Sequence, residues 1–220
     1  MPERKAKRQR ATASIEVTAD ERQNAVRTFN KERIMAAALR IFAESGLNGA
    51  SIRAIAKACG YTPGAIYPYF ESKEHLYAEI LTGSLQRIDA ILLQAKASGN
   101  DPQDKLEAVV LAVYDYYTSH IEEFRLSYYL FENNKQKGLN RALNTDLNNR
   151  VERLLGHFRS AIENSVEIDE GEARLETLAV YGHLTGILLL QSTGRFKVLN
   201  ADGRDLISRY VLAFLSRKAA

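Results

Sequence analysis

The stretch YTPGAIYPYF, residues 61–70, and the lysine shortly after it hold side chains suited to gripping DNA. Tyr67, Tyr69 and Lys73 carry hydroxyl groups and a cation of the kind that proteins use to hold phosphate oxygens. Gly64 has no side chain to keep a helix N-terminus away from a phosphate or a base edge. The chemistry that these residues favour is therefore binding to a nucleic-acid duplex.

The elements that would position these residues form a helix-turn-helix pattern. The segment SIRAIAKACG predicts a short helix that begins after an N-cap at Ser51. Gly60 can adopt the positive φ that stops this helix, and Thr62 and Pro63 can cap and begin a second one. This second helix would enter the major groove and offer a small, apolar surface to the bases at Ala65 and Ile66.

Apolar residues at helical spacing, together with capping residues, predict helices along the rest of the chain. A helix over 30–46 would begin at an Asn30 N-cap and end at Gly46, and a capping box at Thr18 and Glu21 allows a turn or helical extension before it. Further helices are predicted at about 72–99, 101–117, 120–131, 140–164, 171–192 and 202–217. No segment alternates like a strand, so the predicted fold is all-α.

The composition fits a globular protein that meets a polyanion with its N-terminal end. The chain has 220 residues, 45% of them hydrophobic, and a net charge of +3. Its basic excess lies in the first 80 residues and is strongest in the tail MPERKAKRQR. This tail is either a solvated, disordered arm or an arm with a defined nucleic-acid role.

The single cysteine, Cys59, excludes a disulfide within the chain and favours a reducing compartment. The charged start lacks the apolar run of a secretory signal, and the run GILLL is far too short to span a bilayer. We therefore expect a cytoplasmic protein with no membrane partner. His120, His157 and His183 lie too far apart for a recognised metal motif, so we expect no metal site, no cofactor and no catalytic residue.

The segment FAESGLNGASIRAIAKACGYTPGAIYPYFESKEHL resembles the N-terminal signature of TetR-type (tetracycline repressor-like) transcriptional regulators. The match covers about residues 30–80, and its marks are an aromatic residue and Gly46 at the end of the first helix, Ser51, Ile55, Ala56, Gly60, Gly64, Tyr67, Phe70 and the SKE run from Ser72. The resemblance implies an all-α homodimer with a three-helix DNA-binding head and a connecting fourth helix. It also implies a C-terminal helical body that binds a small molecule and dimerises through its last two long helices.

By position, the resemblance implies that Arg53 is the best candidate for a bidentate guanine contact. The DNA-binding residues that it implies are Ser51, Arg53, Thr62, Pro63, Gly64, Ala65, Tyr67, Tyr69 and Lys73. The alternatives are a solvated helix charge for Arg53 and packing between head helices for the tyrosines. Pro68 departs from the family pattern, because it removes the helical bond to the Gly64 carbonyl, and the recognition helix can be cut short or kinked there.

Two segments of the body hold the remaining candidates. The segment VYDYYTSHIEEFRLSYYLF could line a pocket for an apolar or aromatic effector, or simply pack in the core, at Tyr114, Tyr117, Phe124, Tyr128 and Phe131. The segment LAVYGHLTGILLLQ is apolar on most sides, which predicts burial at a subunit interface or, alternatively, within one chain. The candidate interface residues are Gly182, Gly186, Tyr210 and Phe214.

These observations predict a basic, flexible arm at 1–29, a helix-turn-helix domain at 30–80 and a ligand-binding and dimerisation domain at 81–220. The predicted function is that of a sequence-specific transcriptional regulator, a homodimeric repressor that a small molecule releases from its double-stranded DNA operator. The alternatives are a non-specific DNA-binding protein that uses the basic tail, and a helical enzyme without a recognisable motif.

Overall fold

The computed structural model describes residues 18–98, 101–132 and 139–218, except for the side chains of Ser98 and of residues 128–132. Throughout these ranges the regular structure is helical, so the all-α prediction is confirmed. The elements are α1 (Ala19–Gly49), α2 (Ile52–Cys59), a short 3-10 helix η1 (Pro63–Ala65), α3 (Lys73–Ser98), α4 (Pro102–Ser119), α5 (Ile121–Glu132), α6 (Arg141–Ser165), α7 (Glu170–Ser192), α8 (Arg195–Leu199) and α9 (Gly203–Lys218).

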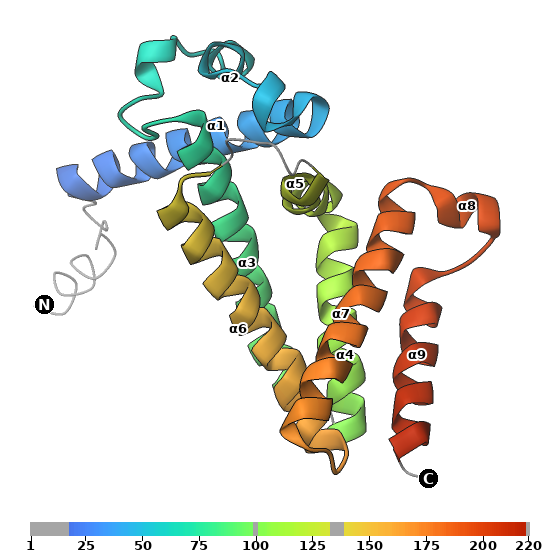
Figure 1. Ribbon diagram of the computed structural model, residues 1–220. Coiled ribbons are helices and arrows are strands. Elements are labelled where there is room, and N and C mark those ends of the chain that lie inside the picture. The colour runs from blue at the N-terminus through green and yellow to red at the C-terminus, as the bar shows by residue number, and fades with distance from the viewer. Residues whose placement is uncertain (1–17, 99–100, 133–138, 219–220) are drawn as a thin grey trace, which may run out of the picture.

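The chain forms a head of α1, α2 and η1 above a helical body, and α3 runs from one into the other (Figure 1). Each part has its own cluster of buried apolar side chains. The head cluster also takes in Leu126 from α5 and Leu147 from α6, and Leu85 on α3 packs against both clusters. The head therefore rests on α3, α5 and α6, which can transmit a movement of the body to it.

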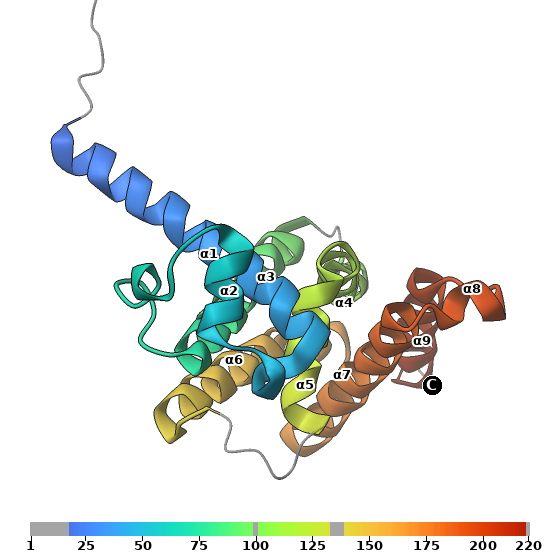
Figure 2. The same cartoon turned by 90° about the horizontal axis from the view of Figure 1, so that it is seen from above.

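The first helix begins earlier than an N-cap at Asn30 would allow. The Thr18 hydroxyl accepts from the Glu21 amide while the Glu21 carboxylate accepts from the Thr18 amide, which completes the capping box. Residues 19–29 are thus helical rather than part of a flexible arm, and Figure 2 shows this end of α1 projecting beyond the head. The predicted N-cap at Asn30 is wrong, because Asn30 lies within the helix.

Local capping explains most of the other helix ends. Helical geometry breaks at Gly46, which has a φ of 66°, as predicted for the end of the first helix. The side chains of Ser72, Asp101 and Asn140 each accept a backbone amide at the start of α3, α4 and α6. Asp169 does the same for α7. The sequence did not predict α8, a five-residue helix that is too short to show a periodic pattern.

In the body, α4 is the central helix and packs against α3, α6, α7 and α9. Helices α7 and α9 also pack against each other, on the side away from α3 (Figure 1). None of the helices in the described ranges is long and apolar enough to cross a membrane.

Candidate functional site

The first helix of the helix-turn-helix pattern forms as predicted. The Ser51 hydroxyl accepts from the Ala54 amide at 3.1 Å, and Gly60 ends the helix with a φ of 73°. Its inner face, Ile55, Ala56 and Cys59, is buried in the head cluster. Cys59 is thus a packing residue, and its thiol donates to the Ile55 carbonyl.

The second element is shorter than the helix that the sequence predicted. Only Pro63–Ala65 are helical, and the Thr62 side chain makes no capping bond, so that part of the prediction is wrong. The amides of Tyr69 and Phe70 both donate hydrogen bonds to the Ile66 carbonyl, so a new turn begins at Ile66. Because Pro68 has no amide to donate to Gly64, an α-helix cannot continue through it. The second element, residues 62–70, which we call the reading element, is therefore a single 3-10 turn followed by a second turn.

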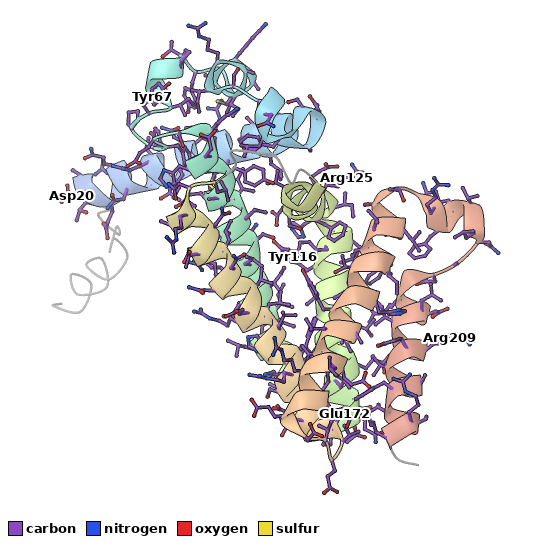
Figure 3. The ribbon with its side chains drawn as sticks, viewed as in Figure 1. Asp20, Tyr67, Tyr116, Arg125, Glu172 and Arg209 are labelled. Atoms are coloured by element: carbon purple, nitrogen blue, oxygen red, sulfur yellow. The ribbon has the colours of Figure 1, made fainter. Side chains whose placement is uncertain are left out.

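Packing divides this element into an outer and an inner surface. Thr62, Pro63 and Gly64 are exposed, and Tyr67 projects from the head with 57% of its surface accessible (Figure 3). Ile66 has no exposed surface and lies in the head cluster, so the expectation that it faces bases is wrong. The turn thus presents small residues and one tyrosine ring outward.

Tyr69 points back into the head instead of outward. Its hydroxyl accepts from the Asn30 side-chain amide at 3.2 Å, and Tyr61 donates to the Asn30 side-chain oxygen at 2.7 Å. The Arg27 guanidinium lies over the Tyr69 ring, 5.9 Å from its centre. Asn30 therefore joins both tyrosines to α1, and in this structure the Tyr69 hydroxyl lies against the head instead of projecting outward.

Lys73 is also engaged within the head. Its ammonium group donates to the carbonyls of Leu47 at 2.8 Å and Ala50 at 3.1 Å, and lies 3.5 Å from the carbonyl oxygen of Asn48. An ammonium group has three donors, and these carbonyls at the end of α1 occupy them. In this structure Lys73 therefore ties α1 to the start of α3, and a phosphate contact would have to replace one of these bonds.

Arg53 and Ser51 remain at the surface. Arg53 is exposed on α2, and within the described residues its guanidinium has no hydrogen-bond or ion-pair partner. Arg27 and Arg33, which the sequence analysis did not select, hold the reading element to α1. Arg33 donates to the Cys59 carbonyl at 3.0 Å and lies over the Tyr61 ring. The capping box at residue 18 was the signal that placed Arg27 on a helix.

The body contains a cavity of about 370 Å³ between α3, α4, α5, α6 and α7. Tyr117 and Phe124 line it, and their rings meet edge to face at 5.5 Å. Tyr114 does not line it and packs toward Gly203 on α9 instead. Tyr128 and Phe131 belong to α5, but their side chains lie outside the described residues. We call this space the inner cavity.

Residues that sequence reasoning missed complete the inner cavity. Leu81 and Leu85 come from α3, Asn148 from α6, and Tyr181 and Thr185 from α7. Burial raises the pKa of Tyr117 and of Tyr181 above the usual tyrosine value, so both hydroxyls are neutral at physiological pH. No described lining residue carries a charge. The cavity thus offers an apolar wall with a few neutral hydrogen-bonding groups.

A partly buried polar network links the connecting helix to the α4–α5 junction. Arg87 on α3 donates to the Tyr116 hydroxyl at 2.7 Å and to the Glu123 carboxylate at 2.7 Å. Tyr116 in turn donates to Glu123 at 2.6 Å. Burial, and then the bond to Glu123, raise the pKa of Tyr116, so its hydroxyl keeps the proton that it donates. The network fixes α3 against α4 and α5.

The outer face of α7 is apolar and uncovered. Gly182 and Gly186 are exposed, and so are leucines on the same helix: Leu175, Leu178, Leu189 and Leu190. Tyr210 on α9 is half-buried and stacks on His183 at 4.2 Å. Phe214 has no exposed surface and lies in the body core, which contradicts its selection as an interface residue. Sequence periodicity identified an apolar side of α9, but not what covers it.

In the described ranges, no group of His, Cys, Asp and Glu side chains comes together as a metal site. The fold and these two sites instead define a class: an all-α regulator with a DNA-binding head and a cavity-bearing body. Comparisons with known proteins agree. Residues 34–80 match the family model described as "Bacterial regulatory proteins, tetR family". The head thus carries this family's DNA-binding domain, and the chain as a whole is similar in fold to TetR-type transcriptional regulators.

Individual regulators are similar to this chain over part or most of its length. The regulator YdgC of Bacillus subtilis is 25% identical over 72% of this chain and 83% of its own length. The repressor KstR2 of Rhodococcus jostii is 40% identical, but over only 36% of this chain and 38% of its own length. The TetR family regulator PfmR of Thermus thermophilus is 21% identical, with a TM-score of 0.69 over 83% of this chain and 94% of that one. The last likeness is one of fold.

Proposed function

We propose that the chain is a homodimeric repressor that binds an operator with its two heads and is released by an effector in the inner cavity. One observation carries this proposal: α3 forms a wall of that cavity at Leu81 and Leu85 and is also fixed within the head at Lys73. An effector that moves this wall therefore moves the head. The protein would work in the cytoplasm, where bacterial DNA lies.

The DNA contacts that we propose are the exposed part of the predicted set. Arg53 reads a guanine, and Tyr67 holds the backbone on the flank of the reading turn. Ser51, Thr62, Pro63, Gly64 and Ala65 complete the surface, whereas Tyr69 and Lys73 position it from within. Because the reading turn is short, its small residues must come close to the groove, which the absence of a side chain at Gly64 favours.

Release follows from the way α3 is held at two points, its start and its middle. At the top, Lys73 and the buried Tyr77 join it to the head core. Lower down, Arg87 holds it to Tyr116 and Glu123. Two heads must sit about 34–36 Å apart to meet successive major grooves. An effector that binds more tightly to an arrangement with the wrong spacing shifts the population away from DNA.

The effector that suits the inner cavity is apolar or aromatic at the part that enters it. The described lining offers rings and aliphatic side chains, and its polar groups are neutral. A charged group placed there would lose its hydration without gaining a partner of opposite charge. Tyr117, Phe124 and Tyr181 are the residues that we expect to contact the effector.

The dimer interface that we propose is the outer face of α7, extended by α9. Gly182 and Gly186 let a second helix approach closely, and exposed leucines surround them. A contiguous exposed apolar face of this kind favours association with a second copy. His183 and Tyr210, stacked on each other, lie at the edge of this face.

The experiment that tests this function is fluorescence anisotropy with duplex DNA from the region upstream of the gene, with scrambled duplex as control, at several salt concentrations. We expect selective binding whose affinity falls steeply with salt, because phosphate contacts release counterions. Arg53→Ala should weaken selective binding about 5- to 150-fold, since a bidentate base contact contributes about 1–3 kcal/mol. Arg153→Ala, an exposed arginine on α6, is the matched control. Equal affinity for the scrambled duplex would favour non-specific binding instead.

A further inference from the structure

A second cavity lies at the joint between the head and the body. It has a volume of about 940 Å³ and is more open than the inner cavity. Its walls are Phe42 and Ala43 near the end of α1, α5, and the end of α7 with the start of α8. We call it the joint cavity. A molecule in it would touch head and body at once.

One side chain lines both cavities. Phe124 on α5 lines both of them and is itself only 5% exposed. On α7 the two linings are consecutive, because Leu188 belongs to the inner cavity and Leu189 to the joint cavity. A rotation of the Phe124 ring would therefore connect the cavities. One elongated molecule can then occupy both of them.

The two cavities differ in charge. The inner cavity has no charged group in its described lining, whereas the joint cavity has Arg125 and Lys197 and no acidic side chain in its described lining. Arg125 donates to the Ser192 carbonyl and pairs with Glu122 at 3.0 Å, which leaves further guanidinium donors. Lys197 is exposed on α8. The joint cavity thus favours an anion, and the inner cavity a neutral group.

We propose that the effector is an amphiphilic anion whose apolar chain fills the inner cavity and whose anionic end lies in the joint cavity between Arg125 and Lys197. This inference rests on the proposed function and names the chemical class of its effector. The neutral hydroxyls of Tyr117 and Tyr181 tolerate the apolar chain of the effector, and the two cations hold its anionic end. Phe124 must turn aside for the chain to pass.

This placement gives the charged end a direct effect on the head. The joint cavity includes Phe42, which is almost fully buried and packs edge to face on Tyr77 at 5.2 Å. Tyr77 also donates to the Leu126 carbonyl of α5 at 2.5 Å. An occupant beside Phe42 therefore acts on the contact between α1, α3 and α5. The apolar chain of the effector moves the α3 wall, while its anionic end displaces α1 at Phe42.

The test is isothermal titration of the whole protein with dodecanoate and dodecyl phosphate, each below its micelle concentration, and with dodecanol below its solubility limit. We expect both anions to bind more tightly than the alcohol, and the tighter of the two to identify a carboxylate or a phosphate end. Lys197→Gln should weaken anion binding about two- to five-fold at low salt and leave dodecanol unchanged. Arg195→Gln, with the same charge change on the same helix but outside the cavity lining, should alter neither.

The orientation has its own readout, because the chain contains no tryptophan. Ala43→Trp places a single tryptophan, which can be excited selectively over the tyrosines, at the joint cavity. We expect 2-bromododecanoate, with bromine beside the carboxylate, to quench it and 12-bromododecanoate not to. The reverse result would overturn the placement of the anionic end.

Failure of this inference can be told apart from failure of the proposed function. Equal binding of dodecanol and the two anions, or no binding of any of them, would overturn the amphiphilic anion while selective operator binding still stood. Anion binding that depends on Lys197 but does not release operator DNA would instead support the two-part site and contradict its role in release.

Discussion

Replacement of Lys73 by methionine separates a structural role of this residue from a role in gripping DNA. Methionine keeps an unbranched apolar side chain but removes the ammonium group that donates to the carbonyls of Leu47 and Ala50. Those carbonyls belong to the end of α1, so the variant leaves them without their cation. We expect a less stable protein in which the head is less firmly held to α3.

The size of the effect follows from the two short contacts. A hydrogen bond that involves a charged group contributes about 1.5–3 kcal/mol, but Lys73 is half-buried and water can replace part of each bond. We therefore expect a loss of about 2 kcal/mol in the free energy of unfolding, instead of the sum of two full bonds. For a chain of this size, this loss lowers the melting temperature by about 4–8 °C.

Thermal unfolding followed by circular dichroism measures this loss, and Lys57→Met, an exposed lysine on α2, is the control for removal of a positive charge. In parallel, the dependence of operator affinity on salt tests the phosphate role. A lost phosphate contact reduces the slope of log affinity against log salt by about 0.9. For Lys73→Met we expect that slope to stay unchanged. An unchanged melting temperature together with a reduced slope would refute the structural role.

Three further predictions concern other positions. Gly60→Ala should cost about 1 kcal/mol in stability, because the φ of 73° at Gly60 is unfavourable for alanine although a Cβ there would meet no other atom. At Gly64 a Cβ would also meet no other atom, and φ is not positive. Gly64→Ala should therefore leave the melting temperature unchanged and reduce operator affinity. Gly182→Arg should give a folded monomer in sedimentation analysis, because a Cβ there meets nothing in its own chain, whereas Gly156→Arg on α6 should leave the dimer intact; a dimeric Gly182→Arg variant would place the interface elsewhere. Finally, burial raises the pKa of Tyr117, so the folded state favours its protonated form. Its contribution to stability is complete below the unfolded pKa of about 10 and falls as the pH rises above that value. Urea unfolding at pH 8 and pH 10.5 measures this change. Between these two pH values, Tyr117→Phe should lose less free energy of unfolding than the parent chain.

The helices and most of their ends could be predicted from the sequence because the interactions that fix them are local. Ser51, Asp101 and Asn140 each cap an amide three residues ahead, so the partners lie within a short window of sequence. Gly60 follows the same logic, since its backbone conformation depends on its own lack of a side chain. Asn30 misled the prediction because its cap-like residue type is used for a different contact, with two tyrosines far along the chain.

The sequence by itself determined the fold class and the first helix of the helix-turn-helix pattern, because each depends on hydrogen bonds between near neighbours or on the geometry of one residue. At Pro68 it left open a shortened or a kinked helix, and the structure shows the short 3-10 helix Pro63–Ala65. Only the tertiary structure decided which side chains are available for binding. Tyr69 and Lys73 have the chemistry to hold phosphate, but partners at Asn30 and Leu47 draw them into the head. Phe214 and Tyr114 are likewise enclosed by neighbouring helices. Residue type sets what a side chain can bind, whereas contacts across the fold set what it does bind.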